Sequence, residues 1–461
     1  MLTSGDTITA ISTPPGEGGI GIVRLSGDHA QEIVQKVLSL PGCKTGNMQP
    51  RQVYYGYLKD PASGRCVDEV ISFYFAAPHS YTGEDVVEIQ THGGIIVVQR
   101  ALQLLLRSGA VMAAAGEFTK RAFLSGRLDL TQAEAVRDLI QADGIAGAAQ
   151  AMEQLSGLLG RRISQLTRKF LQMIATIEVS IDFPDDYGAL DRREFDQSLT
   201  QLAKELQHLL VTADQGRIVR QGLKLVIVGR PNVGKSSLLN SLLGEDRAIV
   251  TAIAGTTRDV LEERFSLDGI VMRLVDTAGL HESADEIEQL GMARTRSSIE
   301  TADLVLWVLD AKESLQEEDR ELALLLQNKP LLLVLNKTDV ADGMDLQKEL
   351  LQRGFKQKPI SIAATLGEGL EGLQDAIRQQ VLTGKIIAGN EPILTSLRHK
   401  DAVEQALRQV EACKQAVAVG LPEDCYVINL RSAYEALATI SGELVSEDII
   451  ETIFSQFCVG K

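Results

Sequence analysis

The chain has 461 residues, 44% of them apolar, and a formal net charge of −16 at pH 7. Such an acidic chain is not expected to bind bare nucleic acid nonspecifically, because phosphate contacts need a basic surface. No apolar run is long enough to cross a bilayer, and the first residues lack the basic start of a signal peptide. We therefore expect a cytoplasmic protein that makes no membrane contact.

The five cysteines are scattered and form no CxxC pair, so reduced thiols are expected. One of them, Cys458, is the fourth residue from the end of the sequence. Prenylation is not expected there, because Lys461 is an atypical last residue and no polybasic run precedes the cysteine. A structural role and a reactive role both remain open at this point.

Residues 1–121 mix short strand-like runs (IGIVRL, EVISFYF, DVVEIQ) with Gly and Pro turns and a helix near 95–107, which is an α+β pattern. From about Thr131 the texture is helical. One apolar stripe predicts a long helix that ends at Pro184, and a second helix is expected at 192–212. The stripe consists of Leu159, Ile163, Leu166, Phe170, Met173, Ile177 and Ile181.

Residues 222–383 alternate strand-like and helical segments, which predicts a largely parallel, doubly wound sheet. Helical texture returns over 384–461, with Val403, Leu407 and Val410 on one face. The simplest interpretation is a helical domain, 122–221 and 384–461, split by an inserted α/β domain. Two separate helical units remain the alternative. The predicted fold class is a multidomain α/β protein.

The stretch GRPNVGKS, at 229–236, follows the strand KLVIV and precedes the helical stretch SSLLNSLL. This is the phosphate-loop pattern in its required strand–turn–helix context. Glycines let backbone N–H groups close around phosphates, where a helix N-terminus favours negative charge. Lys235 is expected to neutralise the β- and γ-phosphates, and the Ser236 hydroxyl to bind Mg²⁺.

Three more motifs lie farther along the chain. The last of them, NKTD at 336–339, ends in Asp339, which can accept hydrogen bonds from guanine N1–H and N2–H, a pairing that adenine lacks. GTTRD, at 255–259, presents Thr257 to Mg²⁺, and in DTAG, at 276–279, Asp276 suits the magnesium shell. The set predicts a GTPase that converts GTP to GDP and phosphate. Leu280 stands where Ras-type GTPases carry the glutamine that orients water.

These four motifs, inside a helical domain that ends in FCVGK, closely resemble the MnmE (TrmE) family of tRNA-modification GTPases. The stretches TPPGEGGIGIVRLSG, SYTGEDVVEIQTHGG and GEFTKRAFLSGRLDLTQAEAV are similar to that family's too, so the resemblance covers essentially the whole chain. It implies a Ras-like GTPase domain inserted in the helical domain. It also implies a homodimer and an MnmG (GidA)-type partner that carries FAD, in a heterotetramer or larger complex.

The resemblance implies that the N-terminal domain serves dimerisation and binds a tetrahydrofolate derivative, either 5-formyl- or 5,10-methylene-tetrahydrofolate. The folate contacts carried over by position are Arg24, Glu84, Arg127 and Lys461. Cys458, in CVGK, then becomes a catalytic or substrate-positioning thiol. The implied reaction adds a carboxymethylaminomethyl or aminomethyl group to C5 of the wobble uridine, position 34, of certain tRNAs.

In the nucleotide site the resemblance implies that K⁺ replaces an arginine finger, held by Asn232, Thr251, Ile253 and Thr256. Glu288 is the implied catalytic acid, which orients the attacking water through a second water. Without the resemblance, Glu288 is an ordinary surface carboxylate of a helix. The implied GTP contacts are Asn232, Val233, Gly234, Lys235, Ser236, Ser237, Thr251, Ala252, Ile253, Ala254, Gly255, Thr256, Thr257, Asp276, Thr277, Ala278, Gly279, Asn336, Lys337, Asp339, Ala363 and Ala364.

Two other functions remain as alternatives. One is a Der- or Era-like switch GTPase that acts in ribosome assembly without one-carbon chemistry. The other is a structural scaffold with a vestigial nucleotide site. The folate-like motifs and CVGK argue against the first, and the intact Lys235, Ser236 and Asp339 argue against the second.

Overall fold

The computed structural model describes residues 5–43, 47–187, 190–245, 263–274, 296–382 and 392–461. The chain forms two compact units. Unit 1 comprises residues 1–137, 155–190 and 421–461, and unit 2 comprises residues 138–154 and 191–420. The domain boundaries expected from the sequence stay a prediction.

Unit 1 begins with a seven-stranded sheet in the order β3-β4-β5-β6-β2-β1-β7. Every neighbouring pair is antiparallel except β1 and β7, which are parallel. The strands are β1 (Ile8–Ile11), β2 (Gly18–Ser26), β3 (Leu38–Ser39), β4 (Val53–Lys59), β5 (Cys66–Phe75), β6 (Val86–Gly93) and β7 (Val111–Met112).

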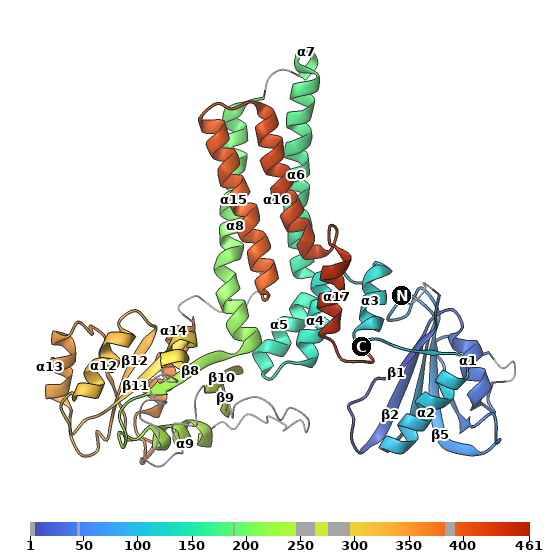
Figure 1. The fold of residues 1–461 in the computed structure, drawn as a ribbon, viewed down its shortest axis with the longest axis horizontal. Helices are drawn as coiled ribbons and strands as arrows, with labels where there is room; N and C mark the ends of the chain where they lie inside the picture. The colour runs from blue at the N-terminus through green and yellow to red at the C-terminus, as the bar shows by residue number, and fades with distance from the viewer. Residues whose placement is uncertain (1–4, 44–46, 188–189, 246–262, 275–295, 383–391) are drawn as a thin grey trace. The chain divides into compact units, whose positions relative to one another are not determined.

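Helices α1 (Ala30–Val37) and α2 (Ile95–Arg107) contribute to one apolar core with this sheet, and α2 lies along it in Figure 1. The helix predicted near 95–107 is confirmed as α2. Large apolar side chains of other strand positions are exposed, among them Ile20, Val53 and Tyr55. They alternate with buried neighbours because successive strand residues point to opposite faces.

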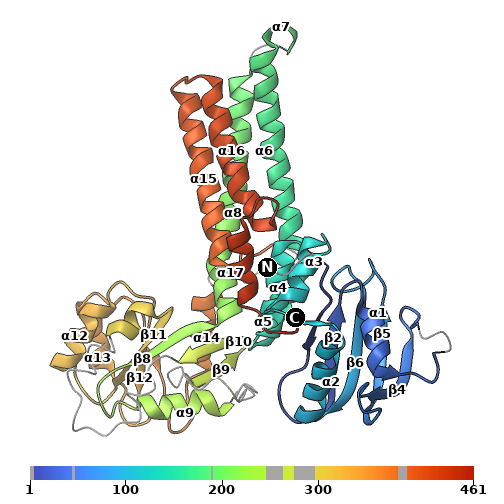
Figure 2. The same cartoon turned by 45° about the vertical axis from the view of Figure 1, so that its right-hand side comes forward.

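Another set of helices lies between the two sheets in the sequence or after the second sheet. It comprises α3 (Glu117–Leu124), α4 (Leu130–Ile140), α5 (Ile145–Leu155), α6 (Leu158–Asp182), α7 (Pro184–Tyr187), α8 (Arg192–Gln221), α15 (Leu397–Ala418), α16 (Glu423–Ser441) and α17 (Glu447–Ser455). Helix α6 packs against α16, and α8 packs against α15 (Figures 1 and 2). Each pair joins a helix from before the insert to one from after it, which confirms the split helical domain.

The apolar stripe predicted for α6 is mostly right. Its first four residues and Ile177 are buried, but Ile174 is buried in place of Met173, and Ile181 is 39% exposed. The 3.6-residue helical period moves the buried face by one position near the end of a long helix. Helix α8 runs nine residues beyond its predicted end at 212, up to Gly222, whose φ of +83° suits a glycine.

Unit 2 contains a six-stranded sheet in the order β13-β12-β11-β8-β10-β9, parallel except for the edge strand β9. The strands are β8 (Leu223–Val228), β9 (Glu263–Leu267), β10 (Ile270–Leu274), β11 (Leu304–Asp310), β12 (Leu331–Asn336) and β13 (Ile360–Ser361). The predicted doubly wound sheet is therefore confirmed.

In the described part of the chain, helices cover both faces of this sheet. Helices α9 (Lys235–Glu245) and α14 (Leu370–Leu382) belong to the core on one face. Helices α12 (Glu317–Leu326) and α13 (Met344–Gln352) belong to the core on the other. This arrangement leaves the carboxyl ends of the parallel strands open, which is where ligands bind in such sheets.

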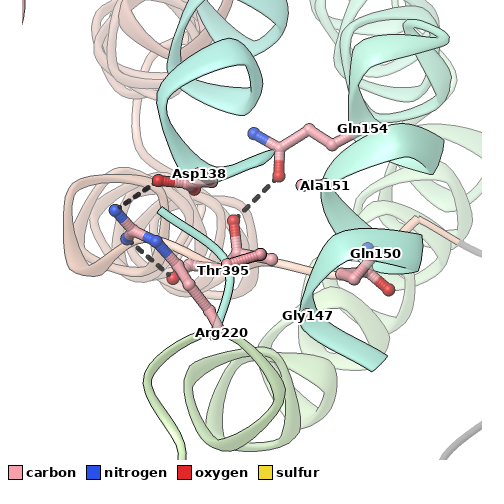
Figure 3. Close-up of a pocket in the computed structure, with 8 residues that line it drawn as sticks. Asp138, Gly147, Gln150, Ala151, Gln154, Arg220 and Thr395 are labelled. Carbon is pink, nitrogen blue, oxygen red and sulfur yellow. Dashed lines mark hydrogen bonds and ion pairs between the residues drawn. The ribbon is translucent and has the colours of Figure 1, made fainter. Parts of the chain in front are cut away.

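The chain enters and leaves the insert at a joint in unit 2 (Figure 3). Arg220, near the end of α8, pairs with Asp138 at 2.8 Å and donates to the Thr395 carbonyl at 3.3 Å. The Thr395 hydroxyl donates to Gln154 Oε1 at 2.8 Å. The cavity among these side chains measures about 10 Å³, enough for about one water, so it is a structural joint and not a ligand site.

In the described part of the chain, none of the helices has the length and apolar character that crossing a membrane requires.

Candidate functional site

The phosphate loop connects β8, a central strand of its sheet, to α9, which begins at Lys235. Asn232 and Gly234 have φ values of +62° and +98°. A side chain at Gly234 would place its Cβ 2.0 Å from Asn336 Nδ2, so only glycine fits. The loop thus wraps tightly over the helix N-terminus, where N–H groups are left for an anion.

Side chains hold the carbonyls of this loop. Lys235 Nζ donates to the Gly229 and Arg230 carbonyls, both at 2.7 Å. Lys337 Nζ donates to the Asn232 carbonyl at 2.8 Å, and Asn336 Nδ2 to the Val233 carbonyl at 2.9 Å. With four carbonyls bound in this way, the loop is preorganised to offer donors rather than acceptors to a phosphate.

The electrostatics of the loop suit an anionic ligand. Burial lowers the pKa of the Lys235 ammonium below its ordinary value, a cost that phosphate charge would offset. Burial raises the pKa of the Asp310 carboxyl, but hydrogen bonds from Lys337 and Lys312 outweigh it, so that pKa lies below its ordinary value. Asp310 thus stays charged and holds Lys337 at 2.6 Å.

A further anchor was not foreseen from the sequence. Arg230, the second residue of the loop, pairs with the buried Asp319 and with Glu313, each at 2.6 Å. Asp319 Oδ2 also accepts the Gln316 N–H at the start of α12. The loop is therefore tied to α12 as well as to β12, by a pairing that no local pattern in the sequence indicates.

In the NKTD motif, Asp339 is exposed, and within the described residues its carboxylate has no hydrogen-bond or ion-pair partner. It can thus accept hydrogen bonds from a ligand, as the predicted contact with guanine requires. The Ala363 and Ala364 N–H groups already donate, to the Glu368 carbonyl at 2.9 Å and to Asn336 Oδ1 at 3.0 Å. Guanine contacts through these two N–H groups stay a prediction.

The exposed Ser236 is the second residue of α9, a position from which its hydroxyl suits Mg²⁺, and Ser237 follows it. The remaining predicted nucleotide, magnesium, potassium and catalytic residues lie outside the described residues. These are Thr251, Ala252, Ile253, Ala254, Gly255, Thr256, Thr257, Asp276, Thr277, Ala278, Gly279 and Glu288.

A second constellation lies in unit 1, on adjacent strands. Arg24 of β2 stands opposite Glu88 of β6 in the strand register, and their side chains pair at 2.8 Å. The Arg24 guanidinium lies 5.5 Å from the ring centroid of Tyr81 and 5.6 Å from that of Phe118. Arg127 lies 5.1 Å from the same Tyr81 ring and donates to its carbonyl. Tyr81 is therefore the common contact of two predicted folate residues.

The C-terminal tail completes this constellation. Ser12 Oγ donates to the Gly460 carbonyl at 3.1 Å, and the Gly116 N–H donates to the Cys458 carbonyl at 3.3 Å. Burial and the charge of Arg24 hold the pKa of Lys461 below its ordinary value, while Glu88 and Cys458 act in the opposite direction. Lys461 and Arg24 therefore lie in one charged cluster.

The helix that delivers the tail is α17. Ser446 is its N-cap, although its side chain makes no capping hydrogen bond. Ile453, Phe454 and Phe457 are buried against α4, whereas Ile449 is 37% exposed. Cys458 itself is exposed, which leaves the thiol accessible to a substrate.

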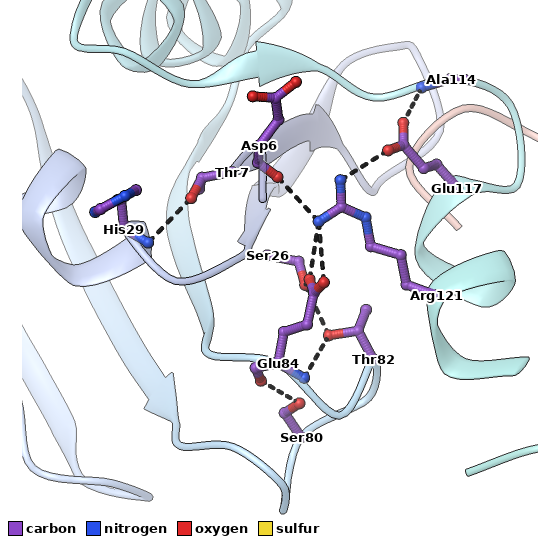
Figure 4. Close-up of polar contacts among 10 residues, drawn as sticks. All are labelled: Asp6, Thr7, Ser26, His29, Ser80, Thr82, Glu84, Ala114, Glu117 and Arg121. Carbon is purple, nitrogen blue, oxygen red and sulfur yellow. Dashed lines mark hydrogen bonds and ion pairs between the residues drawn. The ribbon is translucent and has the colours of Figure 1, made fainter. Parts of the chain in front are cut away.

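Glu84 is placed differently from the other predicted folate residues (Figure 4). Its carboxylate accepts from Ser26 Oγ at 2.7 Å and pairs with Arg121 at 2.9 Å. Arg121 also pairs with the buried Glu117 at 2.9 Å. Glu84 therefore belongs to a network that holds the loop before β6, and Glu88 is the carboxylate beside Arg24.

A cavity of about 580 Å³ opens beside this constellation. Its lining includes Tyr81, Glu88 and Arg127, but not Glu84. The lining combines apolar and aromatic side chains, such as Phe75 and Val86, with charged groups that could orient a polar ligand. The pairing of Glu88 with Arg24 was not foreseen, although Glu88 is a single carboxylate within the apolar strand VVEI, opposite the single arginine of IVRL. The folate role of Glu84 stays a prediction.

Together, the parallel sheet, the tied phosphate loop and the free carboxylate of NKTD define a P-loop protein of the guanine-nucleotide-binding class. Two family descriptions match the chain: "MnmE helical domain" over residues 130–458 and "GTP-binding protein TrmE N-terminus" over residues 7–127. The chain belongs to the MnmE family.

Relatives align over almost the full length. A "tRNA modification GTPase MnmE" of Moorella thermoacetica is 45% identical over 99% of both chains. One of Geobacillus thermodenitrificans is 44% identical over 100% of both. A crystal structure of Era with MgGDPNP and 16S ribosomal RNA nucleotides is 28% identical over 41% of this chain and 66% of that chain, at a TM-score of 0.29, which supports no comparison of architecture.

The position of the tail predicts the effect of Gly460→Ala. Gly460 has a φ of +98°, and a Cβ there would lie 2.1 Å from the Ile11 carbonyl oxygen. We expect the tail to leave its site, so that the Gly116 N–H, which donates to Cys458, exchanges with solvent at least about tenfold faster, the change that ~1.4 kcal/mol produces.

Gly126→Ala is the matched control, because Gly126 also has a positive φ, +74°, but nothing within 4 Å of an added Cβ. In that variant we expect backbone strain at residue 126 alone, so the Gly116 N–H should exchange with solvent as slowly as in the wild type. Hydrogen exchange of residues 114–116 measures both. Unchanged protection in Gly460→Ala would show that the tail does not depend on this fit.

Proposed function

We propose that this chain is a tRNA-modification GTPase that hydrolyses GTP and helps to add an aminomethyl or carboxymethylaminomethyl group to C5 of the wobble uridine. The observation that supports this most strongly is the combination of two sites in one chain: a preorganised phosphate loop and the cluster of Arg24, Glu88 and Lys461 completed by the C-terminal tail. The names of the relatives agree with this assignment.

In the nucleotide site, Lys235 contacts the β- and γ-phosphates, Ser236 and Thr257 bind Mg²⁺, and Asp339 selects guanine. Asn232 and its switch-loop partners would hold K⁺, which would offset the charge of the transition state where other GTPases use an arginine. Glu288 orients the attacking water. The exposed position of Asn232 on its left-handed backbone supports an outward-facing ligand atom.

In the second site, a tetrahydrofolate derivative binds in the cavity beside Tyr81. Two carboxylates suit the N–H donors of the pterin ring, the predicted Glu84 and also Glu88 beside Arg24, and Arg127 suits the anionic glutamate tail of the folate. The folate supplies the one-carbon group. Cys458 contacts or positions the substrate from the docked tail, and an MnmG-type partner supplies FAD and binds much of the tRNA, since this chain is acidic.

A homodimer fits the exposed face of the N-terminal sheet. Val53 and Tyr55 of β4 are 65% and 55% exposed, Ile71 of β5 is 39% exposed, and Ile20 of β2 is 60% exposed. Apolar residues on one strand face of this kind are typical of an interface between subunits. GTP hydrolysis then gates the modification step by opening and closing paired GTPase domains.

The alternative is a switch GTPase of ribosome assembly, which would use the nucleotide site alone. That function would not require the pair of Arg24 and Glu88 in the N-terminal sheet, and it would not require the last residues to bind beside β1. We therefore favour the modification enzyme.

The guanine assignment predicts that Asp339→Asn shifts preference from GTP toward XTP. Asn offers an N–H donor where xanthine carries an oxygen, whereas guanine loses its acceptor, so we expect a change in the GTP-to-XTP affinity ratio of at least about a hundredfold, or ~2.7 kcal/mol. Competition binding measures it. Asp342→Asn, which changes a nearby exposed carboxylate, is the control. Retained guanine preference would refute the base-reading role.

The potassium assignment predicts that replacing KCl by NaCl at equal ionic strength lowers GTP turnover by about tenfold or more while nucleotide affinity changes little. Leu280 cannot orient water, so hydrolysis depends on the cation that lies against the phosphates. Phosphate release and nucleotide binding are measured in both salts. Equal turnover in the two salts contradicts the assignment.

The thiol assignment predicts that Cys458→Ser abolishes modification of tRNA in a reconstituted reaction while GTP turnover stays within about twofold of wild type. Cys66→Ser is the matched control, because that thiol is also exposed. Modified nucleosides are quantified by mass spectrometry. Full modification by the Cys458→Ser protein would make this cysteine a structural residue.

A further inference from the structure

Arg51 stands out among the residues that line the cavity of unit 1. Its φ is +61°, a conformation that non-glycine residues seldom adopt and that is often retained at functional sites. Its backbone N–H is held by the Tyr74 carbonyl at 2.8 Å. Its side chain is exposed, and no ion pair of its guanidinium is recorded in the described residues. The backbone is thus fixed while the charge stays available.

The sheet order and one backbone hydrogen bond place Arg51 at one end of an elongated site. Arg51 lies two residues before β4, and its N–H donates to Tyr74 of β5, whereas Glu88 lies on β6, with Arg24 opposite it on β2. The sheet order β4-β5-β6-β2 separates Arg51 from Arg24 by three strand spacings of about 4.8 Å each, which is ~14 Å. A ligand that reaches both must be long, with different chemistry at its two ends.

Positively charged side chains outnumber negatively charged ones in the lining of the cavity. Of the described residues that line it, Glu88 is the one carboxylate, and it is already paired with Arg24. Arg51 and Arg127 bring guanidinium groups to the lining, and among the described residues the Arg127 guanidinium contacts the carbonyl and the ring of Tyr81 but no carboxylate. Phe75, beside Arg51, adds an aromatic wall. The lining therefore carries an excess of positive charge.

We infer that Arg51 binds the anionic γ-glutamyl chain of the one-carbon carrier and makes the site selective for polyglutamylated over monoglutamylated folates. The inference rests on the proposed folate binding and assigns the length of the ligand's chain, which the predicted folate residues leave open. Each added glutamate brings one carboxylate, and a guanidinium pairs with carboxylates through two parallel hydrogen bonds. Phosphates of an RNA are the competing ligand chemistry.

The test compares full-length protein with 5-formyl-tetrahydrofolate that carries one or three glutamates, at low ionic strength, by calorimetry. We expect the triglutamate to bind about tenfold more tightly than the monoglutamate. Arg51→Gln should reduce this ratio to about threefold or less with little change in monoglutamate affinity, and Arg51→Lys should keep most of it. Higher salt should lower the ratio in the wild type, because partly exposed charges are screened.

Arg65→Gln is the matched control. Arg65 is also exposed and lies in the same domain, but it does not line the cavity, so its loss should leave the ratio unchanged. Equal wild-type affinity for the two folates would overturn the inference while leaving the folate site intact. If neither folate binds, the proposed one-carbon function fails as well. If Arg51→Gln weakens binding of tRNA but not the triglutamate preference, Arg51 contacts phosphate and the inference is wrong.

Discussion

The return of the last residues to the first strands is the constraint on which this architecture depends. The hydrogen bond between Ser12 and Gly460 joins positions 448 residues apart. For the tail to reach this place, α17 must pack its apolar side against α4, and the N-terminal sheet must share a unit with the end of the chain. An insert inside the helical domain leaves this closure intact, which explains how a nucleotide-binding sheet is accommodated in mid-chain.

The two sites use one physical strategy: groups that would compete with the ligand are bound in advance. In the phosphate loop, lysine and asparagine side chains bind the carbonyls. In the N-terminal domain, Arg121 and Ser26 bind Glu84, and Arg24 pairs with Glu88. Because these contacts exist before the ligand arrives, less ordering remains to oppose binding. In the phosphate loop, the groups left for a ligand are mainly positive charge and N–H donors.

The sequence predicted the parts whose signals are local. The phosphate loop and NKTD are contiguous motifs, and the helix at 95–107 was placed correctly from its texture. Contacts between residues that are far apart in the sequence could not be predicted from local patterns. Glu84 and Glu88 lie in the same stretch, and only the strand register places Glu88 beside Arg24. Arg230 and Asp319 are 89 positions apart, so their pairing had no local signature. The buried end of α6 shifted because the helical period drifts along a long helix.

The measurement that tests the central claim most directly is mass spectrometry of tRNA nucleosides from cells that lack this chain. Such cells should lose the aminomethyl-type group at C5 of the wobble uridine in a subset of tRNAs, and the intact chain should restore it. Wild-type levels of the modified nucleoside in the deleted cells, with no other GTPase of this kind present, would contradict the account. The two sites would then have to serve another reaction.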